Sequence, residues 1–184
     1  MCKFVLVGKA ASGKDYCQKV FVERGYKPLR QYTTRPKRPN ETGDEYHFIS
    51  KKQMEKMIDE KKFISIKEFK GWYYAFTLED LEKCDVAILN VGNINDLITW
   101  HPNVLRMSTI IFIDTPIEVR RNRLKSRYSG GYEDDSLERR IEADEKDFKN
   151  FRHYDLKFDG SEEVINFINK TTPLNKNMGT KHKK

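Results

Sequence analysis

Three short apolar runs recur along the chain: Phe4–Val7, Val86–Leu89 and Ile110–Ile113. Each has the length of a strand, contains no alternating polar residues, and is followed by a turn or by a helix-start signal. This pattern is typical of strands in a parallel sheet, because helices cover both of its faces. We therefore expect these runs to be buried parallel strands.

Helical patterns lie between and after these runs. A capping box, Ser50 with Gln53, opens one helix, and Thr115 followed by Pro116 opens another. The predicted helices are Gly13–Arg24, Lys51–Lys61, a helix from Pro116 through Arg127, Ser136–Asn150 and Ser161–Asn169. Strands that alternate with helices predict a three-layer α/β core with right-handed crossovers.

The stretch from Leu29 to Thr77 breaks this alternation. Its short strand patterns surround a single helix and are Tyr32-Thr33, His47–Ile49, Phe63–Phe69 and Trp72–Thr77. We expect an α+β lobe here, inserted between the first and second buried strands. The sequence shows no internal repeats.

The charge is concentrated at one end of the 184-residue chain. The 35 Lys and Arg residues against 28 Asp and Glu residues give a net charge of +7. Five of these charges are lysines at or after Lys170, and no acidic residue follows Glu163, so residues 1–169 carry only +2. Such a core gives little support for a nucleic-acid partner. The almost apolar-free segment 171–184 predicts a basic, disordered tail.

Hydropathy and cysteine usage exclude several classes of protein. The mean hydropathy is −0.79 and the apolar runs are four residues long, whereas a membrane-spanning helix needs about 20. The N-terminus has no cleavage site typical of a signal peptide. Three widely spaced cysteines indicate neither a disulfide framework nor a zinc site. We expect a soluble, cytoplasmic protein, and the sequence carries no signal for an oligomeric state.

The first apolar run ends in a glycine-rich segment of the form G-x-x-x-x-G-K, here called the glycine loop (residues 8–14). Its members are Gly8, Lys9, Ala10, Ala11, Ser12, Gly13 and Lys14. Between a strand and a helix, such a loop binds phosphates through backbone N–H groups and the positive end of the helix. We expect the loop to bind ATP, with Lys14 neutralising the β- and γ-phosphates.

The residue after the loop is Asp15, where Ser or Thr ordinarily ligates Mg²⁺. An acid in the first helical turn is favourable by itself, worth a few tenths of a kcal/mol. Beside a triphosphate, however, an anion is repelled unless a cation lies between them. The hypothesis is that Asp15 binds Mg²⁺ directly or through a water molecule.

The segment Thr33–Phe48 closely resembles the nucleotide-binding signature of guanylate kinases. As in that family, it follows a glycine loop and precedes a tyrosine element, here Gly71–Phe76. The resemblance covers about residues 3–169. It implies a P-loop kinase domain over residues 1–170, with a core (1–28 and 84–170), a nucleoside-monophosphate lobe (about 29–80) and a helical lid (about 123–140).

The resemblance also implies site residues. Arg35 and Arg38 would clamp the monophosphate, since arginine binds phosphate through two parallel hydrogen bonds, and Tyr46 and Tyr74 would donate their hydroxyls. Three arginines match lid residues that contact ATP phosphates and stabilise the transferred charge: Arg123, Arg127 and Arg140. For each of these charged residues the alternative is an ordinary surface side chain.

Four positions depart from the family pattern around the base. Guanylate kinases carry a Ser before the clamp, where this chain has Gln31, and a guanine-reading Glu, where it has Ser65. They carry Ser or Thr in the tyrosine element, where this chain has Phe76, and a D-x-D motif, where it has Asn90. Glu68 replaces the missing carboxylate if the alignment shifts. Loss of that carboxylate predicts altered or relaxed base specificity. The D-x-D motif is absent and Asp15 is present, which suggests that the metal-binding carboxylate has moved from a strand end to the glycine loop.

The favoured function is transfer of the ATP γ-phosphate to a (deoxy)nucleoside monophosphate, GMP or dGMP first, with Mg²⁺. The acceptor phosphate is already ionised, so the reaction needs alignment and cations rather than a general base. The alternatives are a kinase for another phosphorylated small molecule and a catalytically inactive guanylate kinase-like binding module. The presence of Lys14, Arg35 and Arg38 disfavours the module.

Overall fold

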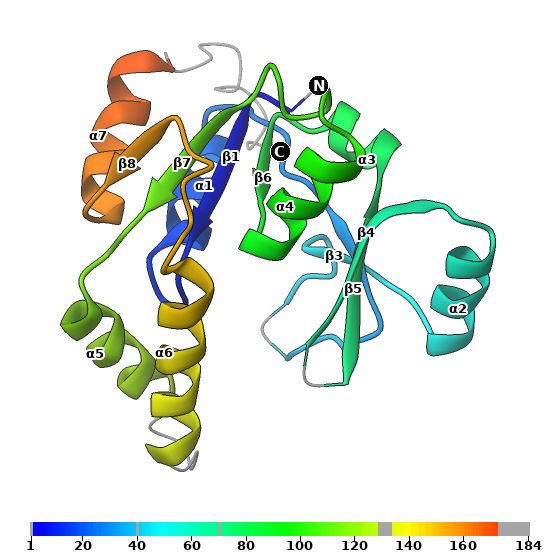
Figure 1. The fold of residues 1–184 in the computed structure, drawn as a ribbon, viewed down its shortest axis with the longest axis horizontal. Coiled ribbons are helices and arrows are strands. Elements are labelled where there is room, and N and C mark those ends of the chain that lie inside the picture. The colour runs from blue at the N-terminus through cyan, green and yellow to red at the C-terminus, as the bar shows by residue number, and fades with distance from the viewer. Residues whose placement is uncertain (1, 40, 70, 129–133, 173–184) are drawn as a thin grey trace, which may run out of the picture.

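The core of the structure is a sheet of four parallel strands in the order β6-β1-β7-β8 (Figure 1). The computed structural model describes residues 2–39, 41–69, 71–128 and 134–172. The core strands are β1 (Phe4–Gly8), β6 (Val86–Ile88), β7 (Thr109–Ile113) and β8 (Leu156–Phe158). The three predicted runs are therefore three neighbouring strands, and β8 is an additional one.

Consecutive strand residues point to opposite sides of the sheet, so these apolar strands give it two apolar faces. Helices cover both of them. On one face, Leu6 and Ile111 pack with α1 (Lys14–Glu23) and α7 (Ser161–Thr171). On the other, Val5 and Val7 pack with α3 (Leu78–Lys83) and α4 (Val91–Trp100). This arrangement confirms the predicted three-layer α/β kinase fold.

A second four-stranded sheet forms the inserted lobe beside the core (Figure 1). Its strand order is β3-β2-β5-β4, and β2 pairs parallel with β3 but antiparallel with β5. The elements are β2 (Gln31–Thr33), β3 (Tyr46–Phe48), α2 (Lys51–Asp59), β4 (Phe63–Phe69) and β5 (Trp72–Thr77). The predicted capping box at Ser50 and Gln53 is present at the start of α2.

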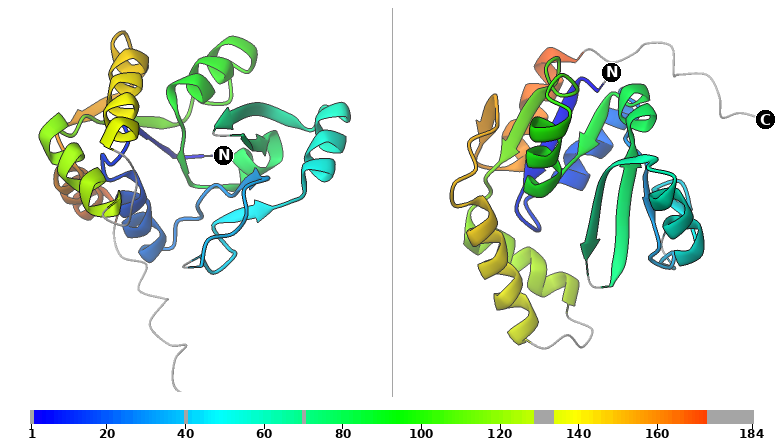
Figure 2. Two further views of the ribbon diagram at one scale, coloured as in Figure 1. Left: turned by 90° about the horizontal axis from the view of Figure 1, so that it is seen from below. Right: turned by 45° about the vertical axis from the view of Figure 1, so that its right-hand side comes forward.

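Two further helices extend beyond the ends of the core strands, as Figure 1 and the right-hand view of Figure 2 show. They are α5 (Ile117–Tyr128) and α6 (Asp134–Phe148), which pack on each other and on the glycine loop through Leu124, Leu137 and Ile141. They occupy the segment predicted as the lid.

The chain after the core ends in α7, which runs through Thr171. The Thr172 hydroxyl is buried and donates to the carbonyl of Ile168. The folded part thus enters the segment 171–184 predicted as a tail, and residues 173–184 lie outside the described residues.

Candidate active site

The glycine loop connects β1 to α1 in a conformation that depends on its two glycines. A Cβ on Gly8 would lie 2.6 Å from the Ile113 carbonyl oxygen. Gly13 has φ +100°, and a Cβ there would lie 2.6 Å from the Cβ of Ser161. Only glycine fits at these positions, which keeps the backbone close to the neighbouring strands and to α7.

Ala11 has φ +58°, a left-handed conformation that costs a non-glycine residue roughly 1–2 kcal/mol. Arg123 holds it there by donating from Nη1 to the Ala11 carbonyl at 3.1 Å. Thr115 holds the next peptide, since its hydroxyl donates to the Ser12 carbonyl at 2.8 Å. These contacts turn the carbonyls of the loop towards the protein, so N–H groups of the first turn of α1 remain to bind an anion.

Lys14 folds back over its own loop. Its ammonium group donates to the carbonyls of Gly8 at 2.7 Å and Lys9 at 2.8 Å. A full positive charge therefore lies at the rim of the loop, as binding of a polyphosphate requires.

The first half of the loop contacts acidic residues of α6 that the sequence analysis did not single out. The Ala10 N–H donates to Asp144 Oδ2 at 2.6 Å, and Lys9 Nζ contacts Glu145 Oε2 at 2.8 Å. Lys9 also lies 3.5 Å from Asp114. Lys9 and Ala10, predicted to bind ATP, are thus held by protein carboxylates in this structure.

Arg35 lies at the end of β2 beside an unpredicted partner, Glu41. Its guanidinium donates to both carboxylate oxygens of Glu41, at 2.6 and 3.1 Å, and lies over the ring of Tyr46. The hydrogen bond from Arg35 is the main cause that lowers the pKa of Glu41. Burial raises the pKa of Tyr46, which keeps its hydroxyl protonated and able to donate. The rings of Tyr46 and Tyr74 lie 6.0 Å apart.

A cavity of about 1150 Å³ separates these aromatic and basic residues from the first turn of α1. Its lining brings together six of the predicted residues: Asp15, Arg35, Arg38, Tyr46, Tyr74 and Arg140. Leu124 of α5 and Phe69 of β4 also line it, so α1, the inserted lobe and the helices α5 and α6 all border this space, whereas no residue of the glycine loop is among its lining residues.

The predicted lid arginines have different positions. Arg123 is bound to the glycine loop, whereas Arg140 lies 5.6 Å from the ring of Phe69 at the tip of the lobe. Arg140 therefore spans from α6 to the inserted lobe. Arg127 lies within α5, but its side chain falls outside the described residues.

Asp15 is exposed on the first turn of α1 and faces the cavity. Its negative charge contributes to the raised pKa of Tyr46, after burial and Tyr74. Within the described residues no group of three or more His, Cys, Asp or Glu side chains is arranged to hold a metal ion. A single carboxylate suits Mg²⁺ that takes its other ligands from water and substrate phosphates, so Asp15 fits that ion.

The four departures near the base have structural roles of their own. Ser65 is buried and accepts from Asn93 Nδ2 at 2.9 Å, while its hydroxyl lies 3.3 Å from Asp96. The other three residues are Gln31, which donates to the Ile88 carbonyl, Phe76, which is fully buried, and Asn90, which caps α4.

Strand alternation decides where a carboxylate at Glu68 lies. Phe69 lines the cavity, and Ser65 and Lys67 both reach Asp96 of α4. These three residues share one face of β4, so Glu68 lies on the opposite face. Glu68 is exposed, and its position gives no support to the shifted alignment.

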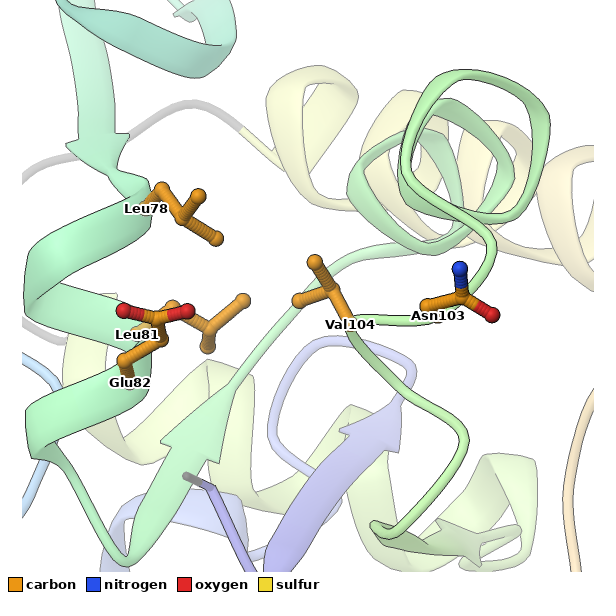
Figure 3. Close-up of a pocket in the computed structure, with 5 residues that line it drawn as sticks. All are labelled: Leu78, Leu81, Glu82, Asn103 and Val104. Carbon is orange, nitrogen blue, oxygen red and sulfur yellow. The ribbon is translucent and has the colours of Figure 1, made fainter.

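A second cavity, of about 150 Å³, lies between α3 and the loop that follows α4 (Figure 3). Three apolar residues line it together with Glu82 and Asn103. Because it contains no cationic side chain, it lacks the chemistry to bind a nucleotide phosphate.

No helix in the described ranges has the length and apolar content needed to cross a bilayer. The fold, the glycine loop and the cavity with its paired arginines and tyrosines define the class of α/β kinases. Within that class, the family model of guanylate kinase matches residues 1–170. The chain belongs to the guanylate kinase family.

Individual relatives are distant but extensive. The guanylate kinase of Nostoc sp. is 24% identical over 83% of this chain and 78% of its own length. That of Wolinella succinogenes is 26% identical over 83% and 73%. The crystal structure of guanylate kinase from Anaplasma phagocytophilum superposes with a TM-score of 0.61 at 16% identity, covering 92% of this chain and 83% of that one.

Proposed function

We propose that the protein transfers the γ-phosphate of ATP to a nucleoside or deoxynucleoside monophosphate. The observation that carries this proposal is the single cavity lined by the first turn of α1 on one side and by Arg35, Arg38, Tyr46 and Tyr74 on the other. The cavity thus places the arginines and tyrosines of the lobe opposite the helix that follows the glycine loop, an arrangement that suits a reaction between two phosphorylated substrates.

The monophosphate would bind at the lobe side of the cavity. Arg35 keeps its geometry through Glu41, Arg38 is exposed at the cavity, and the two tyrosine hydroxyls add donors. The triphosphate would bind at the glycine loop near Lys14. Phosphoryl transfer then needs alignment of the two phosphates and cations over the developing charge, with no general base.

ATP and Mg²⁺ are part of this proposal. The ion would supply positive charge that reduces the mutual repulsion of the phosphates. Asp15 is the residue that would hold it, and Arg140 would reach the phosphates from α6. Because the reaction needs cellular ATP, we propose a cytoplasmic location.

GMP or dGMP is the first substrate to test, because the chain belongs to the guanylate kinase family. Ser65, however, supplies a hydroxyl that is already engaged by Asn93, where a carboxylate would accept two hydrogen bonds from guanine. We therefore expect weaker discrimination against other bases than a buried carboxylate would give.

The test is a coupled ADP-release assay with ATP and Mg²⁺ against a panel of ribo- and deoxynucleoside monophosphates. We expect turnover with guanine nucleotides and measurable turnover with at least one other base. Lys14→Ala should lower kcat/KM by at least about 10²-fold, because it removes the charge that stabilises the transferred phosphoryl group.

The control is Lys52→Ala, which removes a lysine exposed on α2. No turnover with any monophosphate, in a chain that still binds nucleotide, would contradict the proposal. That result would favour a kinase for another phosphorylated molecule or a catalytically inactive binding module.

A further inference from the structure

The glycine loop is fastened to α6 by a cluster of charged residues behind the cavity. Three cations, Lys9, Arg120 and Lys157, meet three carboxylates, Asp114, Asp144 and Glu145. The cluster joins the loop, the first turn of α5, the middle of α6 and β8. Its charges balance, which allows part of it to be buried.

Arg120 is the most buried member of this cluster. Its side chain is 1% exposed, and its Nε donates to the Thr115 carbonyl at 3.0 Å. Nη2 contacts Glu145 at 2.5 Å, and Nη1 lies 3.7 Å from Asp144 Oδ2. A buried guanidinium needs such carboxylates: Arg120 hydrogen-bonds Glu145 and pairs with the charge of Asp144, while its Nη1 makes no hydrogen bond.

Asp144 binds the glycine loop directly. Oδ2 accepts the Ala10 N–H at 2.6 Å, and the next residue, Ala11, is the one with the unfavourable positive φ. A charge-assisted hydrogen bond of this length is among the stronger ones in proteins. It restrains the Lys9–Ala10 peptide immediately before the residue in the left-handed conformation.

The packing of α6 bears on whether this contact competes with a phosphate. The apolar residues Leu137 and Ile141 pack α6 against Ala11, so the helix approaches the loop from the protein side.

Building on the proposed function, we propose that Asp144 is a positioning residue for ATP. Its carboxylate, held by Arg120, fixes the Ala10 peptide and so keeps the N–H groups of the loop in the arrangement that binds the triphosphate. It touches neither substrate.

The first test compares nucleotide affinities. Asp144→Ala removes the acceptor, and Asp144→Asn keeps an oxygen acceptor without the charge. By calorimetry with a non-hydrolysable ATP analogue and Mg²⁺, we expect Asp144→Ala to weaken binding about tenfold, as the loss of one charged hydrogen bond predicts. Asp144→Asn should recover most of that loss, and the affinity for the monophosphate should stay within twofold of the unaltered chain.

The second test does not depend on nucleotide binding. In the nucleotide-free chain, the Ala10 amide should exchange its hydrogen at least about tenfold faster in Asp144→Ala, because its only described acceptor there is Asp144. The amides of Val5 and Leu6 in β1 should exchange as before, which separates a local effect from general destabilisation.

The matched control is Glu142→Ala, an exposed carboxylate on the same helix. Unchanged ATP affinity in Asp144→Ala, tighter ATP binding, or an equal loss of monophosphate affinity would each overturn the proposal. An unaltered chain that binds no ATP would instead contradict the proposed function, and exchange at Ala10 would still show whether Asp144 holds the loop.

Discussion

Glu41 shows how one carboxylate organises a cationic site. It accepts both guanidinium hydrogen bonds of Arg35 and also the backbone N–H of Arg38 at 2.8 Å. Arg35 thus keeps a fixed orientation over the Tyr46 ring before any phosphate arrives. Such preorganisation lowers the entropy lost on binding a dianion.

This ion pair makes stability depend on pH. Arg35 lowers the pKa of Glu41 below its unfolded value of about 4.3, so the pair stabilises the fold above that pH. The contribution is lost as the pH falls through the lower folded-state pKa. We expect the urea midpoint of the unaltered chain to fall more between pH 5 and pH 3 than that of Glu41→Gln.

The control for this measurement is Glu55→Gln, an exposed residue on α2 whose ion pair with Lys51 is 4.0 Å long. It should follow the unaltered chain at every pH. Parallel curves for the chain and for Glu41→Gln would contradict the role assigned to this pair.

At the scale of elements, Asn90 illustrates a position whose local role outweighs its place in a motif. Its side chain accepts the Asn93 N–H at 2.7 Å, and Asn93 Oδ1 in turn accepts the Asn90 N–H at 3.1 Å. The residue expected at a D-x-D motif is therefore the N-cap of α4. Both Asn and Asp serve well at this position.

Two substitutions separate these roles. Asn90→Ala should lower the free energy of unfolding by about 1 kcal/mol, because the first N–H groups of α4 lose their acceptor. Asn90→Asp should keep the stability within about 0.5 kcal/mol. Urea unfolding measures both, and equal losses in the two variants would contradict the capping role.

The same capping logic explains which elements the sequence could predict. The apolar runs and the capping box at Ser50 predicted β1, β6, β7 and α2, because those signals are local. The sequence analysis did not predict α3, α4 or β8, although α3 and α4 open with capping boxes at Thr77 and Asn90. β8 has only three residues with Lys157 in the middle, so it shows no apolar run.

The candidate site was predictable only in part, for a related reason. The glycine loop and the arginines follow from motifs, and the structure brings Arg35, Arg38 and Arg140 to one cavity. Asp144 lies 134 residues from Ala10, and Glu145 lies 136 residues from Lys9. Contacts over such separations leave no periodic signal in one sequence.

At the scale of the whole molecule, the cavity is bounded by three parts that meet at Phe69 and Arg140. Phe69 lies at the tip of the lobe and is 48% exposed, and Arg140 approaches its ring from α6. A cation over an aromatic ring is worth about 0.5–1 kcal/mol at exposed sites. The lobe and α6 therefore meet across the cavity through a weak contact.

We expect Phe69→Ala to lower kcat several-fold, because the lobe loses its contact with α6 when the substrates are enclosed. The free energy of unfolding should change by less than about 0.5 kcal/mol, as for most exposed positions. Steady-state kinetics and urea unfolding measure the two effects.

Trp100→Ala is the control, since Trp100 is 74% exposed at the end of α4 and does not line the cavity. An equal kcat for the unaltered chain and for Phe69→Ala would show that this contact plays no part in turnover.

The hydrogen bonds at the base of the lobe have a consequence for how the chain can be altered. The Lys27 carbonyl accepts the N–H groups of Asp85 and Val86, so the chain enters and leaves the lobe at adjacent points. The whole lobe lies between Lys27 and Asp85, whose backbone hydrogen bond joins the two ends of this segment. A lobe exchanged at this junction would keep both chain ends in place, provided that the replacement retains the contacts with α4 that Ser65 and Lys67 make to Asn93 and Asp96.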